Sequence, residues 1–332
     1  MKPSSNTADM TKGSPVRLIL TFSVPLIIGN IFQQFYNMVD SIVVGNFVGA
    51  NALGAVGACG SLNWLFFSLS SGLGIGIGVI VSQFYGAKRF DKVSETIANS
   101  FYVLISSALV VSILCYLIAP AVLRLLKTPD DIINDSITYM RTTCLGIVAI
   151  SLYNGVSSIL RALGDSKTPL YFLILSSICN VLLDLLFVIS FGWGVFGVAF
   201  ATILSQALSA VVSLFYAFKK ISYFHLTKKQ LKPDFLIIKN SYRLGVPIAL
   251  QSSMIAVSCV FLQSIVNSFG STVVSAYTIT NRIEQLINQP STYNPKHNDR
   301  SFNLANSEHI DPERAKGNIY WDCFHGFRSA LA

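Results

Sequence analysis

The sequence predicts an all-α polytopic membrane protein, with a six-helix amino-terminal lobe followed by the first one to two helices of a pseudo-symmetric second lobe. Of its 332 residues, 52% are hydrophobic and only 12% are charged, whereas soluble globular proteins carry about 25% charged residues. The apolar residues form runs of roughly 20, the length with which a helix crosses about 30 Å of hydrocarbon. Composition and run length together therefore indicate a bundle of transmembrane helices.

Seven apolar runs are long enough to span a bilayer, and the start of an eighth follows them. We expect the spans, in order, at Val16 to Phe47, Ala52 to Tyr85, Val93 to Leu123, Ile137 to Leu160, Pro169 to Phe191, Val195 to Phe218, Val246 to Phe269 and Val273 to Ile287. The first six, within residues 16–218, form the predicted amino-terminal lobe. Residues 219–243 form a basic cytoplasmic loop, and residues 244–289 begin the second lobe.

The lysines and arginines lie mainly in alternate connections, which sets the orientation of the chain because cytoplasmic loops are enriched in these residues. With residues 1–15 in the cytoplasm, the inner segments hold Lys2, Lys12, Arg17, Lys88, Arg89, Lys92, Arg161, Lys167, Lys219, Lys220, Lys228, Lys229, Lys232, Lys239 and Arg243. The outer loops hold only Arg124 and Lys127. We expect a multi-pass protein of the cell inner (plasma) membrane that contacts membrane lipids. The net charge of +8 is therefore explained by the orientation of the chain in the membrane, and no nucleic acid is expected as a partner.

An internal repeat links the first and seventh spans. Residues 23–26 match residues 245–248, and residues 46–50 are echoed by residues 267–271. Such collinear echoes predict two halves related by an axis along the membrane normal, a layout common in secondary transporters. After Gln289 the apolar pattern ends, and shifted codons permitted for residues 318–328 can spell an apolar stretch. Residues 290–332 are therefore a polar tail with two explanations: a native cytoplasmic tail, or, as our hypothesis, a frameshifted remnant on a truncated chain.

Two carboxylates lie within the predicted spans, Asp40 in the first and Asp184 in the fifth. Each costs on the order of 3 kcal/mol at the bilayer centre on insertion scales, which makes it a functional candidate. Asn180 shares a helix face with Asp184. The polar residues of the same half predict one shared cavity: Gln33, Gln34, Tyr36, Asn37, Asn154, Thr202 and Gln206. Carboxylate, amide and hydroxyl oxygens suit Na⁺, and a desolvated carboxylate suits H⁺.

Other patterns carry weaker functional signals. The glycines at 72, 74, 76 and 78 lack the strand and acidic residue of a dinucleotide site, so we expect them to let helices approach closely. Five cysteines lie in apolar runs without metal-ligand spacing, and the four histidines form no ligand set. No protease signature accompanies the aspartates. We therefore expect neither an enzyme nor a cofactor.

The chain resembles bacterial multidrug and toxic compound extrusion (MATE) transporters. The resemblance rests on Gln33 to Ser41, Gln83 to Ala87, Arg161 to Pro169 and Asn180 to Asp184. It implies a twelve-span fold of two six-helix lobes that exports cationic amphipathic compounds in exchange for H⁺ or Na⁺. In the similar DNA-damage-inducible F type branch, the coupling ion is handled in the amino-terminal lobe. The matching positions here are Asp40, Asn180, Asp184 and Thr202, and the seventh span offers no carboxylate.

Two other readings remain open at this stage. A lipid-linked oligosaccharide flippase of the same superfamily would share the architecture but tends to carry cationic residues in its central cavity. A non-transporting membrane scaffold would have no need to bury aspartates. The exporter hypothesis instead predicts small cationic organic substrates and a monomeric protein.

Overall fold

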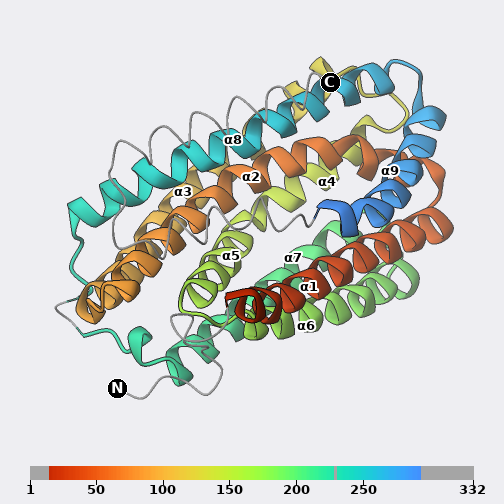
Figure 1. Cartoon of the computed structure of the whole chain (residues 1–332). Coiled ribbons are helices and arrows are strands. Elements are labelled where there is room, and N and C mark those ends of the chain that lie inside the picture. Colours follow the sequence, from red (N-terminus) through yellow and green to blue (C-terminus); the bar gives the residue numbers. More distant parts are fainter. Residues whose placement is uncertain (1–14, 228–229, 293–332) are drawn as a thin grey trace.

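The computed structural model describes residues 15–227 and 230–292, which fold into a bundle of long helices (Figure 1). This confirms the predicted all-α membrane fold. In chain order the elements are α1 (Pro15–Val43), η1 (Val44–Val48), α2 (Ala50–Gly86), α3 (Phe90–Leu125), α4 (Ile133–Leu145), α5 (Ile147–Ala162), α6 (Lys167–Asp184), η2 (Leu185–Ser190), α7 (Gly194–Lys220), η3 (Ser222–Phe224), α8 (Phe235–Asn267) and α9 (Ser271–Thr292). The predicted frameshift lies almost entirely outside the described residues.

Five helices in the described part of the chain, α2, α3, α6 with η2, α7 and α8, are long and apolar enough to cross a membrane. The bent pair α4 and α5 makes a sixth candidate. Helices α1 and α9 coincide with the first and eighth predicted spans but are not among these candidates.

The fourth predicted span is not one straight helix, because α4 and α5 meet at an angle of 48°. Gly146 lies at the break. A Cβ atom there would lie 2.8 Å from Cγ1 of Ile203 in α7, so only glycine lets the two helices meet α7 this closely. The carbonyl of Cys144 beside the break accepts a hydrogen bond of 2.7 Å from the hydroxyl of Ser112. A break inside a membrane span is tolerated where neighbouring side chains satisfy the backbone in this way.

Helix α8 begins at Phe235, well before the predicted span start at Val246. Asp234 explains the earlier start, because its Oδ1 accepts hydrogen bonds from the backbone of Leu236 at 2.9 Å and of Ile237 at 3.4 Å. An aspartate at this position satisfies amide groups that lack a partner within the first helical turn. Part of the predicted basic loop is therefore helical.

Helix α2 lies against α5 and α8, and its glycines allow this close packing. A Cβ on Gly72 would lie 2.4 Å from Cα of Ala249, and one on Gly76 would lie 2.6 Å from Cα of Gly245, both in α8. Gly74 points the other way, where a Cβ would lie 3.4 Å from the backbone of α5. The alternating glycines thus bring the backbones of three helices together, as small residues do inside membranes.

The connection between α1 and α2 resembles the one between α8 and α9. Gly49 precedes α2 with φ of 119°, and Gly270 precedes α9 with φ of 92°. Pro25 lies inside α1 and Pro247 lies inside α8. The short sequence echoes therefore fall at corresponding points of two helical hairpins.

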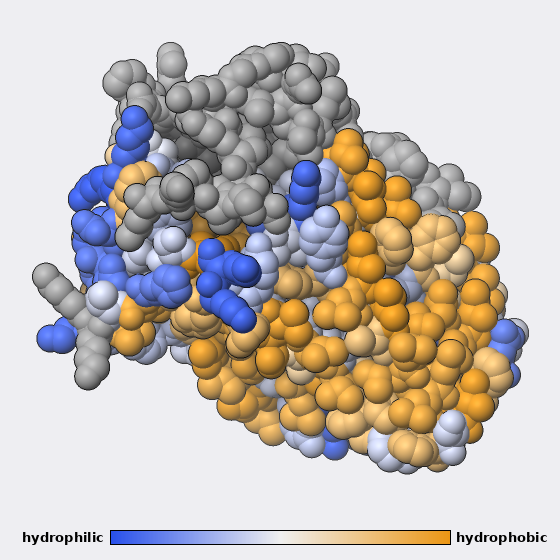
Figure 2. Space-filling model, turned by 90° about the horizontal axis from the view of Figure 1, so that it is seen from below, coloured by the Kyte–Doolittle hydropathy of each residue, from blue (hydrophilic) through white to orange (hydrophobic). Residues whose placement is uncertain are grey.

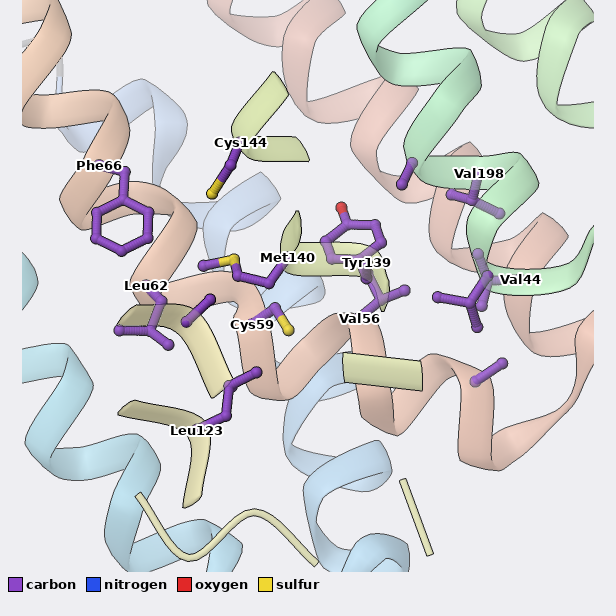
Figure 3. Close-up of a cluster of buried hydrophobic side chains, with 14 of the residues drawn as sticks. Val44, Val56, Cys59, Leu62, Phe66, Leu123, Tyr139, Met140, Cys144 and Val198 are labelled. Carbon is purple, nitrogen blue, oxygen red and sulfur yellow. The ribbon is translucent and has the colours of Figure 1, made fainter. Parts of the chain in front are cut away.

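The main hydrophobic core lies between α2, α3 and α4. Figure 3 shows Val56, Cys59 and Leu62 of α2 beside Met140 and Cys144 of α4. The outer surface carries many large apolar side chains, and Figure 2 shows that they form a broad hydrophobic face with hydrophilic atoms gathered at one end. At this end Figure 1 places the α2–α3 turn and the end of α7, which carry the basic residues Lys88, Arg89, Lys219 and Lys220.

Candidate ion and substrate site

Helices α1 and α6 lie side by side and bring Asp40 and Asp184 together (Figure 1). Only 7% of the surface of Asp40 and none of that of Asp184 is exposed. The two carboxyl groups interact directly with each other, although they are 144 residues apart in the chain. The pair therefore forms a buried acidic centre that combines two predicted site residues.

Several oxygen atoms at this centre accept no hydrogen bond from the described residues. They are Oδ1 of Asp40, Oδ1 of Asn180 and both carboxylate oxygens of Asp184. The amide nitrogen of Asn180 is used, since it donates to Oγ1 of Thr202 at 3.5 Å, and Thr202 donates onward to the carbonyl of Val198 at 3.1 Å. Buried acceptors without donors are costly in proteins. Four such oxygens from two helices favour a bound proton or cation.

A cavity of about 270 Å³ adjoins the acidic centre. We call it the main cavity. Helices α1, α2, α4, α5, α7 and α9 contribute to its wall, which includes the predicted residues Gln33, Tyr36, Asn37, Asp40 and Thr202. The predicted residues Asn180 and Asp184 do not line it. Both are buried behind the wall, where Asp184 contacts Asp40 and Asn180 contacts Thr202.

A smaller cavity of about 120 Å³ holds other predicted residues. Asn154, Gln206 and Gln33 line it, and Gln33 and Phe67 belong to the walls of both cavities. Arg161 also lines the small cavity. Gln34 lines neither. The predicted single cavity is therefore divided in two, with Gln33 and Phe67 at the boundary.

The main cavity also contains polar residues that the sequence did not single out. They include Asn63 of α2, Tyr139 and Thr143 of α4, and Arg282 of α9. Arg282 carried a usable signal, because an arginine inside an apolar run is as unfavourable in the membrane as a carboxylate. The others carried none, since isolated polar residues in spans usually serve as hydrogen-bonding contacts between helices.

Aromatic side chains give the main cavity an amphipathic wall. Trp64, Phe66 and Phe67 of α2 lie on its lining together with Tyr36 and the carboxylate of Asp40. Aromatic faces and a nearby negative charge both attract organic cations. Among the described residues, no group of three or more histidine, cysteine or acidic side chains is arranged to hold a metal ion. The aromatic faces and the carboxylate of the cavity wall suit an organic cation.

Comparison with known proteins identifies the chain's relatives. Residues 25–186 match the MatE family model. The probable multidrug resistance protein YpnP of Bacillus subtilis (strain 168) is 34% identical over 286 residues, which are 85% of this chain and 63% of that protein. The chain thus spans less than two thirds of that relative's length.

Solved structures show the same fold. An inward-facing MATE transporter of the MOP superfamily is 25% identical with a TM-score of 0.72, covering 80% of this chain and 62% of its own. The MATE multidrug transporter DinF-BH is 23% identical with a TM-score of 0.77. The match covers 87% of this chain and 65% of that one. The fold, the family model over residues 25–186 and the curated relative agree: the chain is similar to the MATE family of membrane transporters.

Proposed function

We propose that this chain serves a secondary active antiporter, which exports cationic amphipathic compounds in exchange for H⁺ or Na⁺. Asp40, Asn180, Asp184 and Thr202 hold the coupling ion, and the main cavity takes the organic cation. One observation carries the proposal: four buried oxygens of Asp40, Asn180 and Asp184 accept no hydrogen bond from the described residues. A relative named as a multidrug resistance protein supports the class of substrate.

The energetic basis is the cost of burying two neighbouring carboxylates. A buried charge is tolerated when it is neutralised or paired. A proton on the carboxyl pair, or a Na⁺ among its oxygens, removes the repulsion between Asp40 and Asp184 and satisfies acceptors that the described residues leave without donors. Occupancy by a positive particle therefore stabilises this arrangement of α1 and α6.

Coupling follows from competition for the same negative field. Asp40 both interacts with Asp184 and lines the main cavity, so a cation in the cavity and an ion at the pair lower each other's affinity. By linkage, each ligand then favours the arrangement of helices to which it binds better. The ion and the organic cation consequently drive opposite halves of a transport cycle.

We further propose a cytoplasmic amino terminus in the inner membrane. The hydrophilic end in Figure 2 supports this orientation, because the basic α2–α3 turn and the end of α7 both lie there. Cytoplasmic segments are the ones enriched in lysine and arginine.

Transport by proteoliposomes tests the proposal directly. The purified chain is reconstituted, a fluorescent organic cation is loaded, and a proton or sodium gradient is imposed. We expect gradient-driven movement of the cation, and its loss in Asp40→Asn and in Asp184→Asn without loss of membrane insertion. Asp131→Asn, at an exposed position outside both cavities, is the matched control. Unchanged transport in Asp40→Asn would refute the coupling site.

A lipid-linked oligosaccharide flippase is the second candidate, because an arginine lines each cavity. Arg282 lies in the main cavity and Arg161 in the small one, and guanidinium groups recognise phosphate. The acidic pair at the main cavity opposes an anionic substrate. Binding assays with an anionic lipid pyrophosphate and an organic cation decide between the two candidates, and a preference for the pyrophosphate would favour the flippase.

A further inference from the structure

Arg282 is the one residue of α8 or α9 among the described residues that line the main cavity. Its Nε donates a hydrogen bond of 3.2 Å to Oγ of Ser41, next to Asp40 in the chain. Arg282 also interacts electrostatically with Asp40. Helix α9 packs along α1, which lets the guanidinium group reach the acidic centre. The oxygen atoms of that centre come from other helices, not from α9.

The charges around the cavity nearly cancel. Among the described lining residues, Asp40 carries the one carboxylate and Arg282 the one basic side chain, and Asp184 lies directly behind Asp40. With both carboxyl groups ionised, two negative charges face one guanidinium group. One net negative charge remains, and a single monovalent cation neutralises it.

We propose that Arg282 is a tethered counter-ion of the Asp40–Asp184 pair, which limits the main cavity to one added positive charge at a time. This inference rests on the proposed function and specifies its substrate class: monovalent organic cations are accepted, and dications are disfavoured. A dication would bring its second charge close to the guanidinium group. In the interior of a protein such like-charge proximity is much less screened than in water.

The same residue explains why an ion and an organic cation exclude each other. Once one H⁺ or Na⁺ has bound to the pair, one negative charge remains there and Arg282 balances it, so no surplus negative charge is left to attract another cation. Without Arg282, one negative charge would remain after the ion had bound, and both ligands would be held together. The tethered charge therefore makes the exchange competitive.

The decisive experiment measures two affinities in detergent-solubilised protein. Binding of tetraethylammonium, a monocation, and hexamethonium, a dication, is followed by the fluorescence of Trp64, which lies in the cavity wall. We expect Arg282→Gln to raise the affinity for the dication relative to the monocation by about tenfold or more. Arg282→Lys keeps the charge and should keep the wild-type ratio. Arg243→Gln removes an exposed arginine of α8 outside both cavities and is the matched control.

A charge-compensation series adds a recovery of binding to the test, which a poorly folded Arg282→Gln protein could not produce. Asp184→Asn alone leaves no net negative charge and should weaken tetraethylammonium binding about tenfold or more. The double variant Asp184→Asn with Arg282→Gln regains one net negative charge and should recover the affinity. A double variant as weak as Asp184→Asn, or an unchanged affinity ratio in Arg282→Gln, would overturn the counter-ion role. Unchanged binding in both Asp40→Asn and Asp184→Asn would instead refute the proposed function.

Discussion

Replacing Gly72 with alanine tests the close packing of α2 against α8. The new Cβ would lie 2.4 Å from Cα of Ala249 and 2.5 Å from its nitrogen, whereas carbon atoms in contact are normally about 3.5 to 4.0 Å apart. The two backbones must therefore separate by about 1 Å or more. Overpacking of this kind costs roughly 1 to 3 kcal/mol, which outweighs the gain of about 1 kcal/mol in helix propensity.

The assay is reversible unfolding of the purified protein in detergent, with the midpoint compared among three variants of α2. Gly72→Ala should be destabilised by up to about 2 kcal/mol. Gly74→Ala places its Cβ 3.4 Å from the nearest backbone atom and should be close to neutral. At Gly60 no atom lies within 4 Å of the added Cβ, so Gly60→Ala should be neutral or stabilised. Equal midpoints for Gly72→Ala and Gly60→Ala would refute the packing argument.

Three further predictions concern single side chains. Asp165 is buried and accepts hydrogen bonds of 3.2, 3.0 and 2.5 Å from the start of α6. Asp165→Ala should therefore lower the unfolding free energy by about 1 to 3 kcal/mol without changing the affinity for the organic cation. A large loss of that affinity in folded protein would contradict this prediction. Trp64 lines the main cavity, so Trp64→Phe should abolish quenching by a bound organic cation, while quenching that persists through another tryptophan would place the ligand elsewhere. Burial and the neighbouring Tyr85 raise the pKa of Tyr223, in the connection after α7, above its ordinary value. Stability should therefore be retained below about pH 10 and fall as the pH rises through the folded-state pKa, and Tyr223→Phe should remove that part of the alkaline loss.

The helices were largely predictable because most of them are apolar runs of spanning length. The departures have local causes. The break at Gly146 depends on the proximity of Ile203 in α7, a contact that the sequence pattern does not encode. The early start of α8 was readable in principle, because Asp234 precedes an apolar run and acts as an N-cap.

The candidate site was predictable where burial of a charge left a signal. Asp40 and Asp184 stood out as carboxylates within apolar runs, and the structure brings them into contact. Asn154 and Gln206 were equally visible as polar residues, but they line a separate, smaller cavity. Which polar residues share a wall depends on helix rotation and packing, which one sequence does not reveal.

The two helical hairpins also differ in an informative way. When Gly49 of the first is aligned with Gly270 of the second, the position that corresponds to Asp40 holds Phe261, an exposed aromatic residue. The shared backbone design thus carries a carboxylate at this position in one copy and an exposed aromatic side chain in the other. The second hairpin instead contributes a positive charge to the cavity, through Arg282 of α9. The duplicated scaffold has diverged in the sign and the place of its charges, and exchanging the residues at positions 40 and 261 would show whether the carboxylate can act from the second copy.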